Sequence, residues 1–309
     1  MLSRIAESLF WIGRYVERAD GTARIVDVLR LQQMEEASQS ESISARLVLS
    51  DVMGLPTPQG PLTFDDVANR LVFDTSRQSS ISGTWWAARE NARRARETLS
   101  TELWECINTS WHRWRDLGSY SVTSTHLDWV RERAALVAGI ADATMSHDEA
   151  LNFLLLGRLL ERADMTARLV ATGSLPGNDE STWISVLQSC GAAQAYLRTN
   201  RGVVEDERAA AFLVLDRLFP RSIVYSLTEA ERRLLALDPE VDRIGFSDEA
   251  RRRLGRIRTS LEYRAIADVI PDLPAQMLRV QQTVIAASDA VARRYFKAGP
   301  VQTWTEELA

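Results

Sequence analysis

A charged motif that occurs twice is the feature of this sequence best suited to chemistry. GRYVERADGTAR begins at Gly13 and GRLLERADMTAR begins at Gly157, and nine of the twelve positions are identical. Residues three and four apart lie on one face of a helix, so each copy should place arginines beside carboxylates. The resulting candidate site residues are Arg14, Glu17, Asp20 and Arg24 in the first copy and Arg158, Glu161, Asp164 and Arg168 in the second.

Two interpretations of these charged residues stay open at this level. In the structural one, the arginines and carboxylates satisfy one another and fix the packing of partly buried helices. In the functional one, guanidinium groups bind a carboxylate or phosphate in a cleft, while the carboxylates bind an amine or act as acid and base. The arginines expected to bind an anion are Arg14, Arg24, Arg158 and Arg168, and the carboxylates expected to bind an amine or orient the arginines are Glu17, Asp20, Glu161 and Asp164.

A second charged cluster lies in the sequence RENARRAR, which begins at Arg89. One interpretation is a solvated helix face with internal ion pairs. The other is a third wall of the same polar centre, with Asn91 as a hydrogen-bonding amide. The candidate residues of this cluster are Arg89, Glu90, Asn91 and Arg93.

The elements that must position these residues are predicted to be helices. Apolar residues recur at spacings of three and four, as in the stripe that contains Leu9, Ile12 and Val16, and no convincing hairpin occurs. Capping patterns predict helix starts at Thr63 and near Ser146, the latter beginning a helix over 147–172. The segment 84–115 lacks proline and glycine, which predicts one long helix. We therefore expect an all-α bundle of about ten helices.

Two further blocks repeat in the same order as the charged motif. LVFD at 71–74, followed by Ser80-Ile81, matches LVLD at 213–216, followed by Ser222-Ile223, and 141–143 weakly matches 288–290. These blocks predict a single domain over 1–309, built from two duplicated halves of about 1–145 and 146–309. Such halves usually pack about a pseudo-two-fold axis, which would bring the two charged motifs together.

Composition excludes several classes of protein. The formal charge is −5, which argues against nucleic acid as a partner bound by bulk charge. No apolar run approaches the roughly 18 residues of a membrane span, and charges follow the first apolar residues too closely for a signal peptide. Two cysteines and three scattered histidines indicate neither a disulfide framework nor a metal site, and no nucleotide-binding motif implies a cofactor. We expect a cytoplasmic protein.

The motifs resemble those of a known family. SLFWIGRYVERADGTAR near the start, ARENARRAR in the middle and FPRSI at 219–223 are similar to the bacterial alpha-E family, whose name refers to helices that carry a Glu-Arg pair. The matching pairs here are Glu17-Arg18 and Glu161-Arg162. The resemblance implies an all-helical protein that is encoded beside, or fused to, a circularly permuted ATP-grasp protein, often beside a transglutaminase-like protease. It assigns no catalytic residue.

These observations lead to one functional expectation and two alternatives. The expectation is a helical accessory subunit that docks on an ATP-grasp peptide or amide ligase, with an arginine- and glutamate-lined site for a small anionic or zwitterionic ligand such as an amino acid or peptide. The first alternative is a stand-alone enzyme in which Glu17 or Glu161 has a raised pKa and acts in acid–base chemistry. The second alternative is a homo-oligomeric scaffold.

Overall fold

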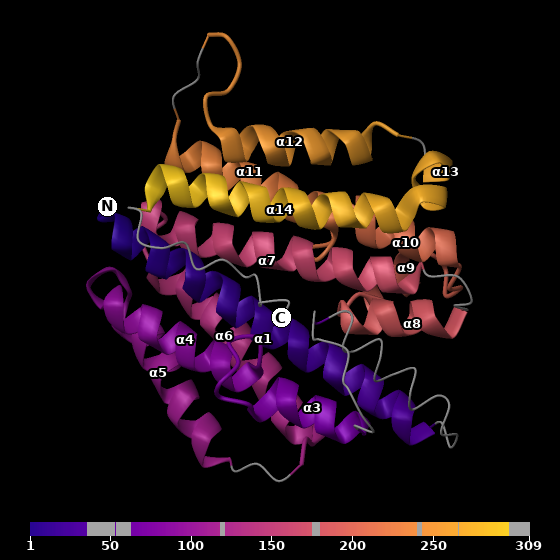
Figure 1. Ribbon diagram of the computed structural model, residues 1–309, viewed down its shortest axis with the longest axis horizontal. Helices are drawn as coiled ribbons and strands as arrows, with labels where there is room; N and C mark the ends of the chain where they lie inside the picture. The colour runs from indigo at the N-terminus through magenta and orange to yellow at the C-terminus, as the bar shows by residue number, and fades with distance from the viewer. Residues whose placement is uncertain are drawn as a thin grey trace, which may run out of the picture.

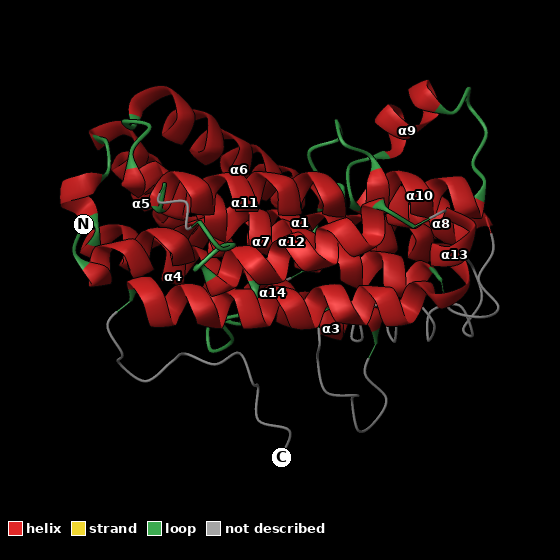
Figure 2. Ribbon diagram, turned by 90° about the horizontal axis from the view of Figure 1, so that it is seen from above, coloured by secondary structure: helices red, strands yellow, loops and turns green. Residues whose placement is uncertain are grey.

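The chain folds into helices throughout the part that the structure describes. The structure is a computed structural model, and it describes residues 1–35, 53, 63–117, 121–174, 180–239, 243–264 and 266–296. No strand occurs within these residues, so the predicted all-α class is confirmed (Figure 2). The α-helices are α1 (Ser3–Glu35), α3 (Phe64–Phe73), α4 (Ile81–Arg94), α5 (Thr101–Asp116), α6 (Ser124–Thr144), α7 (Glu149–Gly173), α8 (Glu180–Ser189), α9 (Ala193–Thr199), α10 (Asp206–Leu215), α11 (Ile223–Leu237), α12 (Glu249–Glu262), α13 (Ile266–Val269) and α14 (Leu273–Tyr295).

Two long helices form the centre of the bundle. α1 and α7 pack directly against each other and carry the two copies of the charged motif. α4 and α6 pack against α1, whereas α11 and α14 pack against α7, so each central helix lies among helices from its own part of the chain (Figure 1). The relation between the two whole halves stays a prediction.

The central position of α7 follows from its sequence. Apolar or small residues lie on every side of this helix, and a helix that is apolar all round is buried in a protein interior. Twenty of its twenty-five residues are buried, including Glu161, Arg162 and Asp164. The charged motif is therefore not on a solvated face, and its ions must find partners inside the bundle. None of the described helices offers an apolar stretch long enough to span a bilayer.

One predicted helix start is confirmed, a second is confirmed in part, and one predicted helix is wrong. Thr63 Oγ1 accepts a hydrogen bond from the backbone N–H of Asp66 at 3.2 Å, as expected for the start of α3. The helix predicted over 147–172 is α7, although its capping side chain is that of Asp148 rather than Ser146. The single helix predicted over 84–115 is wrong, because α4 ends at Arg94 and Ser100 caps a new helix by accepting from Leu103 N at 3.1 Å.

Candidate functional site

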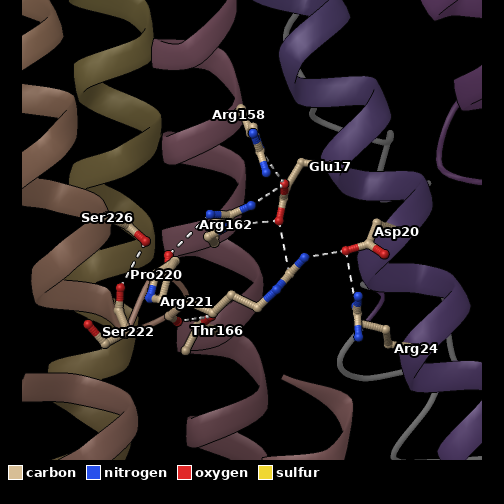
Figure 3. A network of polar contacts seen from close by, with 10 residues as sticks. All are labelled: Glu17, Asp20, Arg24, Arg158, Arg162, Thr166, Pro220, Arg221, Ser222 and Ser226. Atoms are coloured by element: carbon tan, nitrogen blue, oxygen red, sulfur yellow. Dashed lines mark hydrogen bonds and ion pairs between the residues drawn. The ribbon is translucent and has the colours of Figure 1, made fainter. Parts of the chain in front are cut away.

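The two copies of the charged motif meet where α1 crosses α7. Each glutamate of one copy accepts hydrogen bonds from arginines of the other. Glu17 accepts from Arg158 Nε at 3.1 Å, and it accepts from Nε and Nη2 of Arg162, each at 2.8 Å (Figure 3). These bonds join residues more than 140 positions apart in the sequence, so they fix the contact between the helices rather than either helix alone.

The glutamate of the second copy is bound by arginines of the first copy. Glu161 of α7 accepts from Arg14 Nε at 2.8 Å and from Arg18 Nε, both on α1. The two Glu-Arg pairs thus bind each other, since the Glu of each contacts the Arg of the other. Each aspartate also pairs within its own helix: Arg24 Nε donates to Asp20 Oδ2 at 3.0 Å, and Arg168 Nε donates to Asp164 Oδ2 at 2.9 Å.

Both glutamates are buried, with 5% of the Glu17 side chain and none of the Glu161 side chain exposed. Burial alone would raise the pKa of Glu17, but Arg162, Arg221 and Arg158 outweigh it and hold that pKa below its usual value. Burial alone would also raise the pKa of Glu161, but Arg18 and Arg14 outweigh it and hold that pKa below its usual value. A catalytic acid or base in the paired glutamates would need the opposite shift, so this electrostatic environment does not favour the enzyme alternative.

Arg221, which sequence reasoning did not select, completes the network around Glu17. It lies just before α11 and donates from Nη1 to Glu17 Oε1 at 2.9 Å and from Nη2 to Asp20 (Figure 3). The turn that carries it is fixed to α7, because Arg162 Nη1 donates to Pro220 O at 3.2 Å and Thr166 Oγ1 donates to Arg221 O at 3.0 Å. Although burial would lower the pKa of Arg221, the neighbouring carboxylates raise it.

A sequence signal for Arg221 exists in the repeated block. The alignment that pairs Ser222 with Ser80 places Ser79 opposite Arg221. The first half therefore lacks an arginine at the position where the second half has one. Comparing the two blocks residue by residue would have identified this difference.

A pocket of about 90 Å³ opens beside this network, between α1, α6, α7 and Arg221. Its charged lining combines three arginines with two carboxylates, and the rest is apolar or glycine. The charged residues are Glu17, Asp20, Arg24, Arg158 and Arg221, and the others are Ile12, Gly13, Val16, Ala134, Ala135, Val137, Ala138 and Leu154. The carboxylates are covered, whereas Arg24, Arg158 and Arg221 keep 24%, 31% and 20% of their side chains exposed. The exposed charged surface of these lining residues is therefore mainly cationic.

The Glu161 side of the crossing has a different environment. Arg14 keeps only 7% of its side chain exposed, and its Nη1 donates to Ser288 Oγ of α14 at 2.7 Å. Arg14, Glu161, Asp164 and Arg168 do not line the pocket. Of the eight motif residues, the pocket contains Glu17, Asp20, Arg24 and Arg158.

The cluster on α4 is not a third wall of this pocket. Arg89 Nε donates to Asn108 Oδ1 of α5 at 2.8 Å, and Arg89 and Arg93 both pair with Glu90. Asn91 Nδ2 donates to Ala87 O at 2.9 Å, within its own helix. These residues contact one another and α5 on the α4–α5 side, where Arg89, Glu90 and Asn91 are half-buried and Arg93 is exposed. In the described part of the chain, His, Cys, Asp and Glu form no group of three or more that could hold a metal ion.

The helical architecture and the paired Glu-Arg motifs agree with comparison to known families. The Alpha-E family, described as a predicted alpha-helical domain with a conserved ER motif, matches residues 1–296. The chain belongs to this family. Glu17-Arg18 and Glu161-Arg162, the Glu-Arg pairs of the repeated motif, both lie at the crossing of α1 and α7.

Relatives of the chain are longer proteins. An uncharacterised protein of Mycobacterium bovis and one of Mycobacterium tuberculosis are each 24% identical to it over 312 residues, which cover 92% of this chain and 35% of the relative. The chain thus spans about a third of the length of these relatives. No solved structure matches it.

Proposed function

We propose that this chain is a non-catalytic binding subunit of an ATP-grasp-type peptide or amide ligase system. Its pocket would hold an anionic or zwitterionic group of a small ligand, such as an amino acid or the end of a peptide. The observation that carries the proposal is the pocket itself, in which Arg24, Arg158 and Arg221 present open guanidinium surface beside covered carboxylates. Guanidinium groups held in this way suit a carboxylate or phosphate.

The difference between the Glu17 side and the Glu161 side of the crossing supports a binding role in addition to a structural one. Arg14 and Arg158 occupy matching positions of the repeat and bind matching glutamates. Ser288 bonds to Arg14, whereas the wall beside Arg158 is formed by small and apolar residues of α6. Ion pairs that only hold the two helices together need no such opening, so the Glu17 side of the crossing is available for a ligand.

The ligase partner is suggested by the family resemblance and is compatible with the pocket. ATP-grasp ligases activate a carboxylate as an acyl phosphate, so a helper that holds an anionic group would act next to that chemistry. The relatives contain much more chain than this domain, which is consistent with a module that works together with other domains. The lowered pKa values of Glu17 and Glu161 keep both ionised near neutral pH, which suits positioning of arginines better than proton transfer.

The test is reconstitution with a circularly permuted ATP-grasp protein from the same genome. The two proteins should co-purify, and ligase turnover, measured as ADP release, should depend on this chain. Arg158→Gln should reduce that turnover at least tenfold. Arg168→Gln is the control, because Arg168 has a similarly exposed side chain but lies outside the pocket.

Two results would contradict the proposal. One is ligase turnover that is the same with and without this chain. The other is substrate turnover by the purified chain alone that is lost in a folded Glu17→Gln variant, since that result would identify an enzyme.

A further inference from the structure

We infer that the pocket selects a carboxylate that carries a short aliphatic tail and has no charged amine beside it. The inference rests on the proposed function, because it names the ligand class of the same pocket. It decides between the anionic and zwitterionic ligands that the proposal leaves open. Three features of the pocket carry it, namely unused guanidinium donors, saturated carboxylates and an apolar wall.

Two arginines keep their terminal donors unused. Arg158 donates through Nε to Glu17, and Arg24 donates through Nε to Asp20. Within the described residues, neither arginine donates a hydrogen bond from Nη1 or Nη2. The carboxylates thus orient the two guanidinium groups. Both terminal nitrogens of Arg158 are left for a ligand, whereas Nη1 of Arg24 lies against Gly191, where an added Cβ atom would be 2.9 Å away. A carboxylate is matched to such donors in charge and in geometry.

Among the residues that the structure describes, the pocket offers no side-chain carboxylate oxygen with open surface for an ammonium group. Glu17 accepts four hydrogen bonds, from Arg158, twice from Arg162 and from Arg221, and an ionised carboxylate has about four acceptor sites. Asp20 Oδ2 accepts from Arg24 and Arg221. Asp20 Oδ1 accepts no hydrogen bond but is itself buried, so it has no surface open to the pocket. A ligand ammonium would therefore face three guanidinium groups without a counter-ion in reach.

The rest of the pocket fits a short hydrocarbon tail. Ala134, Val137 and Ala138 of α6 and Ile12 and Val16 of α1 form its apolar wall. Cavities of about 150 Å³ hold benzene in other proteins. The volume here is about 90 Å³, which corresponds to a carboxylate with a tail of a few carbons. Inorganic phosphate has no hydrocarbon group that could contact the apolar wall.

The experiment is a ligand-observed NMR titration of the full chain with propionate, L-alanine and inorganic phosphate. L-alanine shares the carbon skeleton of propionate and adds only the ammonium group. We expect propionate to bind at least tenfold more tightly than either of the other two. Ala138→Leu, which fills the apolar wall, should weaken propionate binding by a similar factor.

A matched pair of variants locates the binding. Arg24→Gln and Arg168→Gln each remove an arginine that bonds to an aspartate four residues earlier, at 3.0 and 2.9 Å, but only Arg24 lines the pocket. Arg24→Gln should weaken propionate binding at least tenfold, whereas Arg168→Gln should leave it unchanged. Equal effects of the two variants would place the binding elsewhere and overturn the inference.

The outcomes separate this inference from the proposed function. If L-alanine binds as tightly as propionate, the inference is wrong and the proposed zwitterion site stands. Tighter binding of phosphate than of propionate also overturns the inference, because it shows that the apolar wall is not used. If none of the three probes binds to the folded chain at millimolar concentrations, both the inference and the pocket's role as a site for small anions fail.

Discussion

Gly13 and Gly157 hold the same place on the two sides of the α1–α7 crossing, each against the backbone of the opposite helix. A Cβ atom on Gly13 would lie 2.0 Å from Leu154 O, and one on Gly157 would lie 2.0 Å from Phe10 O. Because neither glycine has a side chain, the helices approach closely enough for the arginines of one to reach the glutamate of the other. The ion network and the pocket beside it depend on this approach.

Replacing either crossing glycine should therefore destabilise the fold. Gly13→Ala forces a methyl group into a backbone carbonyl, and we expect it to lower the free energy of unfolding by about 3 kcal/mol or more. Gly139→Ala is the control, since Gly139 lies in α6 with nothing within 4 Å of an added Cβ. That change should stabilise the protein by about 0.5–1 kcal/mol, because alanine favours a helix more than glycine. Urea denaturation of both variants checks the pair, and equal effects would show that the helices do not touch at Gly13.

Removing the charge of a buried glutamate should also be costly. Glu161→Gln removes the buried carboxylate that Arg14 and Arg18 contact, so we expect a loss of about 3–5 kcal/mol of unfolding free energy. Glu249→Gln is the matched control, because Glu249 also pairs with two arginines, Arg253 and Arg293, but at the surface. It should change stability little, since solvent screens exposed pairs. A similarly small effect of Glu161→Gln in the same denaturation experiment would contradict the buried network.

Stability should depend on pH through the same carboxylates. The pKa values of Glu17 and Glu161 are lowered in the folded protein from an ordinary value of 4.5, so the folded state binds protons less readily than the unfolded state. Their stabilising contribution is therefore fully present above about pH 5 and is lost as the pH falls towards the folded-state pKa values. We expect the free energy of unfolding to decrease from pH 5 to pH 3, and to decrease less steeply in Glu161→Gln. Parallel slopes for the two proteins would show that Glu161 is not paired in the folded state.

The thiol of Cys190 should be inert until the protein unfolds. Burial raises the pKa of Cys190 to about 12, although Arg221 and Arg24 lie near enough to oppose the shift. Because the thiolate is the reactive form, a buried thiol with this pKa reacts slowly near neutral pH. In a Cys106→Ala background at pH 8, DTNB should label Cys190 at the rate of unfolding. Immediate labelling of the folded protein would show that the region around Arg24 is open.

The fold class was predictable because helical periodicity is a local property of the sequence. The spacing of Leu9, Ile12 and Val16 predicts a helix whatever it packs against. The break between α4 and α5 was missed, because it contains neither proline nor glycine and depends on one capping side chain, that of Ser100. Ends of this kind are determined by a single hydrogen bond rather than by a pattern.

The candidate site was predictable only in part, for a geometric reason. The repeat indicated that the two charged motifs meet, and Glu17 does contact Arg158 across the crossing. It did not identify Arg18 and Arg162 as the partners across the crossing, because the angle between α1 and α7 decides which arginine reaches which glutamate. Arg221 could not follow from the motif, since it reaches Glu17 from a turn that is distant in the sequence.

The central claim is that the two Glu-Arg pairs bind each other in the buried crossing of α1 and α7. A double-mutant cycle on Glu17 and Arg162 tests it most directly, because Arg162 donates to both oxygens of Glu17. Urea denaturation of Glu17→Gln, Arg162→Gln and the double variant gives the coupling free energy. The structure predicts a coupling of about 2–3 kcal/mol, as found for buried partners in contact. A coupling below about 0.5 kcal/mol, which is typical of separated or solvent-exposed charges, would contradict it.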